Sequence, residues 1–528
     1  MNAEIIEIEA AGSSRESLTD LLLKRGIPLN ARCGQRGICR GCMVDLVEGG
    51  LIGPSGETVT AGQAVRSCQM RLPSGGKVRV RIHEQARISS APQVGETFRV
   101  DIPCELSPWI SAKAGKDTGF AVDVGTTTVV VLLADLNSGE VLARAGDFSA
   151  QIRYGDNVVT RIGAASLAET RREMCRALVD ETLSPLLDQA CGRAGRDRSR
   201  LAGGTIAGNT TMLHILADED PTPLGIAPFT PRFLESRVLQ ASDLGLKEEI
   251  PLLLLPGLSA YVGADITAGV HATGMTFDKK PSLLVDLGTN GEIVLSAGGR
   301  LIGCATAAGP AFEGCGLSCG TRAQDGAVSG ISMTADPLRV KTRSIGGGPA
   351  RAGICGSAYV DFLALGRAHG LILGNGRFDR ALWARLSEKQ RLETDDGLAF
   401  RLPGAMGPAI SEIDIAQLLQ AKAAIGAGIG ILLDSAGIAP AEIGRVYLAG
   451  GFGMHVNVGH AIAIGLLPGF RPDQVRVVGN TALAGALLAL LDGTALVEME
   501  ALRERMEVVE LNAHPDFEDA YIDHLSLP

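Results

Sequence analysis

Two stretches of this chain, 163 residues apart, repeat one structural unit. Residues 120–131 (FAVDVGTTTVVV) and 283–294 (LLVDLGTNGEIV) each contain an apolar run, an Asp-x-Gly-Thr turn and a second strand-like run. Short apolar runs on both sides of a glycine-containing turn are typical of buried strands joined in a hairpin. From residue 118 onward, strand and helix patterns alternate, which indicates an α/β fold. The repeat therefore predicts two similar half-domains, one starting near residue 119 and the other near residue 281.

The two turns carry residue types that suit a phosphate group. Glycine lets backbone N–H groups approach phosphate oxygens, threonine adds a hydroxyl, and Asp123 or Asp286 could hold Mg²⁺ or its waters. A single turn of this kind is also an ordinary hairpin turn. Here there are two, and a Gly450-Gly451 turn follows a third apolar strand at residues 446–448. This ordered set of three turns predicts a nucleotide site.

Four cysteines have the spacing of an iron–sulfur site. Cys33, Cys39 and Cys42 lie in one glycine-rich loop, and Cys68 follows from a distant segment. Thiolates are soft ligands, and three in one loop with a remote fourth is the arrangement of plant-type [2Fe–2S] ferredoxins, although this loop is one residue longer. Structural zinc is the alternative, but zinc sites usually contain two C-x₂-C pairs, and only one is present here. The sequence therefore predicts a [2Fe–2S] cluster on these four cysteines.

Charge and composition exclude several classes of function. The 528 residues carry a formal net charge of −10 and no block of Lys and Arg, which argues against a nucleic-acid partner. No uninterrupted apolar run reaches the length of a membrane span, and the acidic N-terminus lacks the features of a signal peptide. Eleven cysteines without an export signal favour a reducing compartment. We expect a cytoplasmic protein without a membrane partner.

The chain divides into four predicted segments. Residues 1–86 form one unit around the cysteine loop. Residues 87–117 contain three prolines and no hydrophobic period, so they predict a linker without a core of its own. Residues 118–280 and 281–528 are the two predicted lobes.

Several further residues have two possible roles. Glu313 either orients a water molecule or caps a helix end, and Lys422 either lies near the nucleotide or is a solvated lysine. The glycines of residues 426–430 lie within a helical pattern and are expected to serve packing rather than dinucleotide binding. The roles of four cysteines in Gly/Ala-rich turns stay open: Cys304, Cys315, Cys319 and Cys355.

The three turns, in their order, resemble the superfamily of acetate and sugar kinases, heat-shock chaperone ATPases and actin. The resemblance implies ATP with Mg²⁺ as ligand and a two-lobed actin-like ATPase fold. It also assigns a role to each turn. The phosphate-1 hairpin would contain Asp123, Gly125, Thr126 and Thr127, and the phosphate-2 hairpin would contain Asp286, Gly288, Thr289 and Asn290. The adenosine turn would contain Gly450, Gly451 and Phe452. The second hairpin departs from the glycine-rich pattern of the superfamily. Which carboxylate positions the attacking water therefore stays open, with Asp123, Asp286 and Glu313 as catalytic candidates.

Residues 1–86 resemble the [2Fe–2S] ferredoxins of the β-grasp type, including the Arg-Ser-Cys-Gln sequence around Cys68. The whole chain, with its GNTTM, DLGTNGEI, AAGPAFEG, GICGSA, AKAAI and LAGGFG segments, resembles the reductive activators of corrinoid proteins. That family uses ATP to return an inactivated Co(II) corrinoid on a methyltransferase partner to Co(I). The resemblance implies a corrinoid protein as partner, a low-potential electron donor and a homodimer.

Three alternatives belong to other functional classes. They are a chaperone-like reactivating factor for a cobalamin enzyme, a small-molecule kinase with a fused redox domain, and an activator of radical dehydratases. Activators of radical dehydratases hold a [4Fe–4S] cluster between subunits, and the N-terminal ferredoxin makes such a cluster unnecessary here.

Overall fold

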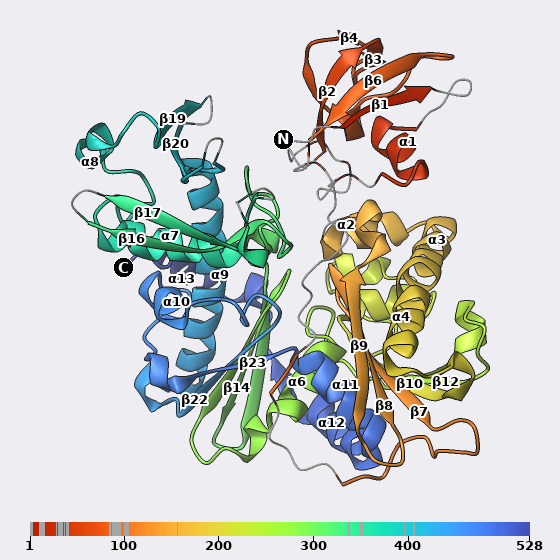
Figure 1. Cartoon of the computed structure of the whole chain (residues 1–528). Coiled ribbons are helices and arrows are strands. Elements are labelled where there is room, and N and C mark those ends of the chain that lie inside the picture. Colours follow the sequence, from red (N-terminus) through yellow and green to blue (C-terminus); the bar gives the residue numbers. More distant parts are fainter. Residues whose placement is uncertain are drawn as a thin grey trace.

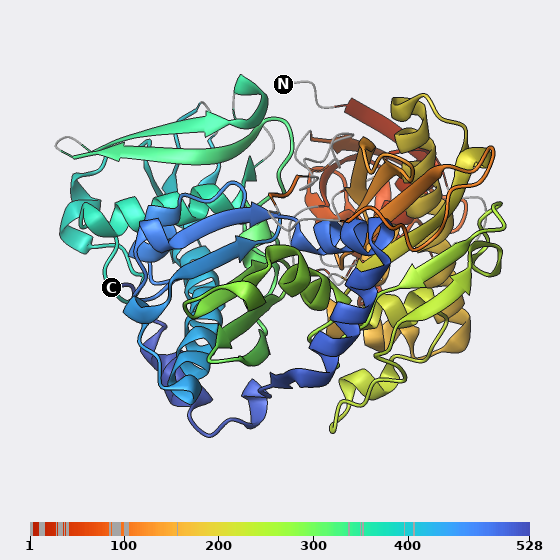
Figure 2. The same cartoon turned by 90° about the horizontal axis from the view of Figure 1, so that it is seen from below.

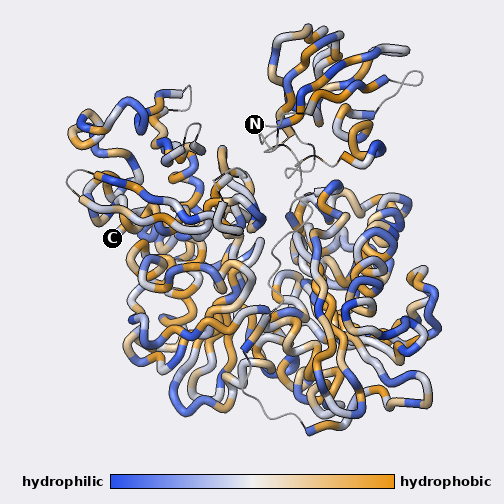
Figure 3. Tube along the Cα trace, in the orientation of Figure 1, coloured by the Kyte–Doolittle hydropathy of each residue, from blue (hydrophilic) through white to orange (hydrophobic). Residues whose placement is uncertain are grey.

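The computed structural model has three parts, which Figure 1 shows as an N-terminal β domain and two larger α/β lobes. The described residues are 4–9, 16–27, 29, 35, 37, 42–83, 86, 97–99, 105–155, 157–335, 338–348, 350, 353–394, 397–404 and 407–528. In both lobes the most apolar segments gather in the central sheets (Figure 3).

The N-terminal domain is a four-stranded sheet with strand order β1-β6-β2-β5. Its strands are β1 (Glu4–Glu9), β2 (Met43–Glu48), β5 (Ala64–Arg66) and β6 (Lys77–Ile82), with a β3–β4 hairpin (Gly50–Ile52 and Thr58–Thr60) beside them. Helix α1 (Leu18–Lys24) begins at the capping box of Ser17 and Asp20 and buries Leu18 and Leu22.

The first lobe is built on a six-stranded sheet of order β11-β12-β10-β7-β8-β9. Its strands are β7 (Thr118–Val124), β8 (Thr128–Asp135), β9 (Val141–Phe148), β10 (Leu201–Gly208), β11 (Arg237–Gln240) and β12 (Pro251–Leu254). Strands β7, β8 and β9 form an antiparallel meander, and β10 and β12 continue the sheet in parallel with β7. All eight residues of β10 are buried, because helices cover both faces of the sheet.

The second lobe repeats this topology. Its sheet has the order β23-β22-β13-β14-β15-β24. The strands are β13 (Ser282–Leu287), β14 (Gly291–Ala297), β15 (Arg300–Thr306), β22 (Arg445–Ala449), β23 (Val475–Gly479) and β24 (Met506–Val508). Again an antiparallel meander is extended by two parallel strands, β22 and β23. The predicted pair of similar half-domains is confirmed.

Helices pack around both sheets. Those of the first lobe are α2 (Val158–Ala165), α3 (Ala168–Leu178), α4 (Ser184–Ala194), α5 (Thr210–Leu216) and α6 (Ala264–Thr273). Those of the second lobe are α7 (Gly356–Ala368), α8 (Arg380–Arg385), α9 (Glu412–Ala436), α10 (Val458–Ala463) and α13 (Phe517–Asp523). Two small sheets complete that lobe: β17-β16-β18 (Arg339–Ser344, Ala327–Thr334, Gly353–Ile354) and β19-β20-β21 (Arg391–Thr394, Gly397–Arg401, Ala409–Ser411).

Helix α9 has the length and apolar composition of a membrane span. Most of its residues are buried inside the protein, where Ile425, Ile429 and Leu432 belong to the core of the second lobe. Two of its glycines serve packing, as predicted: a Cβ at Gly426 would come within 2.4 Å of the His524 ring, and one at Gly428 within 2.8 Å of the Thr306 side chain. The helix is therefore a core element in this fold.

The chain crosses back to the first lobe near its C-terminal end. Helices α11 (Thr481–Leu491) and α12 (Gly493–Arg505) follow β23, and α11 packs on α6, β7 and β10. Figure 2 shows this blue pair between the two lobes. Leu483, Leu490 and Met499 belong to the core of the first lobe, although the sequence places them in the predicted segment 281–528. The boundary near residue 280 stays a prediction.

The described residues of the predicted linker pack on this crossing. The Arg99 N–H donates to the Val478 carbonyl (2.9 Å), the Asn480 N–H donates to the Thr97 carbonyl (3.0 Å), and the Trp109 N–H donates to the Leu490 carbonyl (3.1 Å). The side chains of Phe98 and Trp109 lie against the core of the first lobe. Residues 97–99 and 105–117 are therefore attached to the two-lobed body.

Candidate functional site

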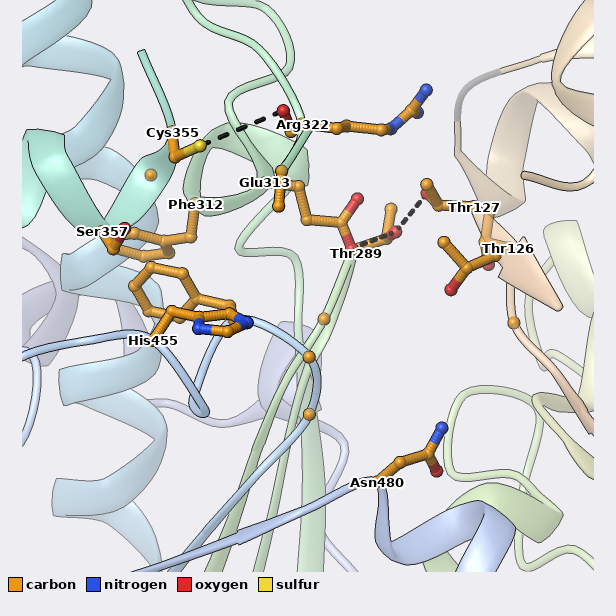
Figure 4. Close-up of a pocket in the computed structure, with 18 of the residues that line it drawn as sticks. Thr126, Thr127, Thr289, Phe312, Glu313, Arg322, Cys355, Ser357, His455 and Asn480 are labelled. Carbon is orange, nitrogen blue, oxygen red and sulfur yellow. Dashed lines mark hydrogen bonds between the residues drawn. The ribbon is translucent and has the colours of Figure 1, made fainter. Parts of the chain in front are cut away.

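A cavity of about 490 Å³ lies between the two lobes, a volume in the range of small-molecule sites (Figure 4). Residues from both hairpin tips and from the loops after β10, β22 and β23 line it. Of the residues assigned from the sequence, it contains Asp123, Gly125, Thr126, Thr127, Asp286, Gly288, Thr289, Asn290, Glu313, Gly450, Gly451 and Phe452. The structure thus brings together residues that are up to 329 positions apart in the chain.

The first hairpin tip, between β7 and β8, is closed by a hydrogen bond from the Gly125 N–H to the Thr128 carbonyl (3.0 Å). The fully buried Arg161 of α2 donates to the Thr126 carbonyl from behind, and its Nε donates to the Gly155 carbonyl (3.1 Å). Asn209, the N-cap of α5, donates from Nδ2 to the Thr126 hydroxyl (2.9 Å). These contacts fix the tip, so its backbone is preorganised for an anion.

The second tip, between β13 and β14, is closed by a hydrogen bond from the Gly288 N–H to the Asn290 carbonyl (3.0 Å). The turn after β22 lies against it. Gly450 has φ +87°, and a Cβ there would collide with the Leu287 carbonyl and come within 2.7 Å of Asp286 Oδ1. Only glycine allows this close approach.

A chain of hydroxyls joins the two tips across the cavity, as Figure 4 shows. The Thr127 and Thr289 hydroxyls are 2.9 Å apart, and the Thr289 hydroxyl donates to Glu313 Oε1 (3.1 Å). The second carboxylate oxygen, Glu313 Oε2, is buried and has no hydrogen-bond partner among the described residues. An acceptor of this kind at the phosphate end of the cavity fits a role in holding a water molecule.

Four further carboxyl groups face the same space and repel one another. Burial raises the pKa of Asp123 to about 6. Burial and the nearby Asp123 raise the pKa of Asp265 to about 7, and burial with Asp265 and Asp123 raises that of Asp286 to about 8. Burial, then Asp265 and Asp286, also raise the pKa of Glu292 well above its ordinary value. The arrangement favours a bound cation, which would relieve the repulsion.

Mg²⁺ with a nucleotide fits this set. In the described part of the chain, no three His, Cys, Asp or Glu side chains are grouped as direct ligands of a metal ion. Mg²⁺ usually keeps several waters and binds through one or two carboxylates and the phosphates of its nucleotide. Asp123 and Asp286 would therefore hold Mg²⁺ through waters.

The opposite end of the cavity is aromatic. The rings of Phe312 and Phe452 are 5.2 Å apart, and His455 and Ser357 lie beside Phe312 in Figure 4. Burial lowers the pKa of His455, which favours the neutral ring. An apolar wall of this kind suits a flat base rather than phosphates.

Lys422 is not part of this site. It does not line the cavity, and its Nζ donates instead to the Ser526 carbonyl (2.7 Å) near the C-terminus. Burial lowers its pKa to about 8. Neither sequence-based expectation describes it, because its position on α9 faces the packed C-terminal segment rather than the nucleotide or the solvent.

The site contains five residues to which the sequence assigned no individual role: Asn209, Asp265, Glu292, Arg322 and Asn480. For Asn209 and Asp265, the sequence predicts only that residues 207–213 and 262–266 form polar turns facing a cleft. A repeated Gly-Asn-Thr sequence at residues 208–210 and 479–481 could have revealed the two asparagines. Each asparagine follows a strand of a central sheet and caps a helix. Asn480 Nδ2 donates to Asp123 Oδ2 (2.8 Å), as Asn209 does to Thr126.

The cluster site is described only in part. Cys33 and Cys39 lie outside the described residues. Cys42 and Cys68 are both buried, and the Ser67 N–H donates to the Cys42 carbonyl (3.1 Å), so the two cysteine-bearing segments are held together. Gly37, in the cysteine loop, has φ +74°, and a Cβ there would come within 2.7 Å of Gln69. This close approach of Gly37 to Gln69, the neighbour of Cys68, fits a thiolate-bound cluster.

Three family models match the chain. They describe a 2Fe-2S iron-sulfur cluster binding domain (residues 4–73), the RACo middle region (118–278) and the C-terminal ASKHA domain of RACo (280–528).

Two curated relatives and one solved structure are similar to the chain. The corrinoid activation enzyme RamQ of Eubacterium limosum is 28% identical over 98% of this chain and 97% of its own length. A reductase of Methanosarcina barkeri, named for the Co(II) methylated amine-specific corrinoid protein, is 25% identical over 74% of this chain and 72% of its own. The solved structure of a reductive activator for a corrinoid, iron-sulfur protein has a TM-score of 0.75 and 29% identity, covering 98% of this chain and 96% of its own.

Fold, site and family models together define an actin-like ATPase with an N-terminal [2Fe–2S] ferredoxin domain. The predicted fold class is confirmed, and so are a [2Fe–2S] cluster and ATP as cofactors. The chain belongs to the family of reductive activators of corrinoid proteins.

Proposed function

We propose that this protein uses ATP to drive the transfer of one electron from its [2Fe–2S] cluster to the Co(II) of a corrinoid protein in a methyltransferase system. The observation that carries the proposal is the pairing of a ferredoxin domain with a nucleotide cleft on one chain, in an order shared over 98% of its length with a reductive activator. A low-potential electron donor would reduce the cluster. The working form would be a cytoplasmic homodimer.

The energetics explain why both sites are needed. Plant-type [2Fe–2S] centres have potentials of about −400 mV. The resemblance to reductive activators implies a Co(II)/Co(I) target couple that is more negative still. Each ~59 mV of uphill gap disfavours one-electron transfer about tenfold. When bound, the cluster supplies single electrons, and ATP supplies the free energy of phosphoryl transfer. ATP can shift a conformational equilibrium only through different affinities for the two states.

The residues between the two sites offer a route for that coupling. Phosphates bound between the hairpin tips would replace the contact of Thr127 with Thr289, and the lobes would move relative to each other. Asn480 contacts Asp123 through its side chain and Thr97 through its backbone. Because residues 97–99 lead back to the ferredoxin domain, a movement of Asp123 on nucleotide binding would be passed through Asn480 to the segment that carries this domain.

The test is anaerobic incubation of the full-length protein with a Co(II) corrinoid protein and a low-potential reductant, while the visible spectrum is recorded. Co(I) should form only when ATP is also present. The control is Asp286→Ala, which should keep the cluster spectrum but form no Co(I). Reactivation of a cobalamin enzyme by exchange of its cofactor, without Co(I), would favour the chaperone alternative. A phosphorylated small molecule would favour the kinase.

A further inference from the structure

One positively charged side chain in the cavity has no role in the site described so far. Arg322 lies in the loop between the short 3₁₀ helix η9 (Pro310–Glu313) and β16. Figure 4 shows it reaching across the cavity toward the side of Thr126 and Thr127. Its Nε and Nη2 are buried and find no hydrogen-bond acceptor among the described residues. Two buried guanidinium nitrogens without acceptors are costly, so their N–H groups are available for an anion.

The contact that Arg322 does make crosses from one lobe to the other. Its guanidinium carbon lies 4.9 Å from the ring centre of Phe148, at the end of β9 in the first lobe. A cation above an aromatic face is a weak interaction without directional hydrogen bonds. It positions the group near the cavity without using up the donors that a phosphate would take.

The acidic groups around Arg322 show why a positive charge is needed at this position. The cavity contains five carboxyl groups, at Asp123, Asp265, Asp286, Glu292 and Glu313, yet it must accept a polyanion. Arg343 also lines its rim, but that side chain is exposed and lies against Gly330. Among the described arginines that line the cavity, Arg322 is the one with buried donors that have no acceptor. Its planar fork matches two phosphate oxygens at once.

We propose that Arg322 is a catalytic residue that binds the terminal phosphoryl group of ATP, and that Phe148 holds it in a standby position before the nucleotide arrives. This inference rests on the proposed function, since it assumes ATP hydrolysis in this cavity. In that reaction a water oxygen bonds to the terminal phosphorus, and the bond from phosphorus to the bridging oxygen breaks. The electron pair of that bond stays with ADP, and a water proton passes to Glu313. Arg322 stabilises the charge on the transferring oxygens.

The test uses the full-length protein and four variants: Arg322→Gln, Arg322→Lys, Phe148→Leu and the matched charge control Arg339→Gln. Arg339 is exposed on β17 and does not line the cavity. The measurements are ATP turnover and the affinities for ADP and for ADP with aluminium fluoride, which imitates the transferring phosphoryl group. Arg322→Gln should lower turnover and the ADP–aluminium fluoride affinity by at least about 100-fold, while the affinity for ADP changes less than about threefold.

Arg322→Lys should keep the fold and the charge but restore only part of the turnover, because lysine lacks the fork. Phe148→Leu should release Arg322 and tighten ATP binding about two- to fivefold. Equal affinity of wild type and Arg322→Gln for ADP–aluminium fluoride would overturn the inference, as would an equal loss in Arg339→Gln. If the wild-type protein hydrolyses no ATP, the proposed function itself fails, which is a different result.

Discussion

The carboxyl group of Asp286 should make the nucleotide-free protein less stable as the pH rises. Burial, Asp265 and Asp123 raise its pKa from an ordinary 3.8 to about 8. Between these two values the folded protein holds a proton that the unfolded chain has already lost. The free energy of unfolding therefore falls as the pH rises through this window, and the loss is complete above about pH 8. Asp286→Asn removes the ionisation and should remove this loss.

The size of the effect follows from the site. A pKa that rises from 3.8 to about 8 corresponds to roughly 6 kcal/mol for a carboxyl group sealed from water. Asp286, however, lines an open cleft and is only partly buried, so water and the neighbouring carboxyls screen much of this cost. We expect Asp286→Asn to gain about 2 kcal/mol at pH 8.5, or about 4–8 °C in the unfolding midpoint, and almost nothing at pH 4.

The assay is thermal unfolding without nucleotide, followed by tryptophan fluorescence. The chain has two tryptophans, Trp109 against the core of the first lobe and Trp383 in the core of the second, so both lobes are reported. Mg²⁺ should stabilise the wild type at pH 8.5 but not the variant. Asp434→Asn, at an exposed position of α9, is the control and should show no pH-dependent gain. A gain that is absent at pH 8.5, or equal at pH 4 and pH 8.5, would refute the reasoning.

Three further predictions test other parts of the molecule. Cys39→Ser should abolish the visible absorbance of the cluster, while the wild type should contain about two irons per chain by metal analysis; zinc in place of iron would contradict this. Gly479→Ala should displace residues 97–99 and speed amide exchange at Asn480. Gly479 has φ +81°, and a Cβ there would collide with the Thr97 carbonyl. The control Gly430→Ala, whose Cβ would have nothing within 4 Å, should have neither effect. Lys422→Met should leave ATP turnover near that of the wild type, because this side chain does not line the cavity; a large loss would return Lys422 to the site.

The sequence allowed much of the site to be predicted wherever a local pattern carried the chemistry. The Asp-x-Gly-Thr turns and the Gly450-Gly451 turn are short, and glycine is needed where backbones come close. The spacing of residues within each turn therefore predicts which of them line the site. Asn480 was missed because its partner Asp123 is 357 residues away. Lys422 was misplaced for a related reason, since nothing near it in the sequence indicates that the Ser526 carbonyl will accept a hydrogen bond from its Nζ.

The sequence by itself determined the two hairpins, their repetition and the cysteine spacing, because strand alternation, glycine turns and ligand spacing are properties of neighbouring residues. Only the tertiary structure decided that α11 and α12 return to the first lobe, that Arg161 supports Thr126, and which carboxyls share one cavity. These features depend on which distant segments come into contact, and burial and charge repulsion act only after that contact is made. The raised pKa of Asp286 is therefore a property of the folded cleft.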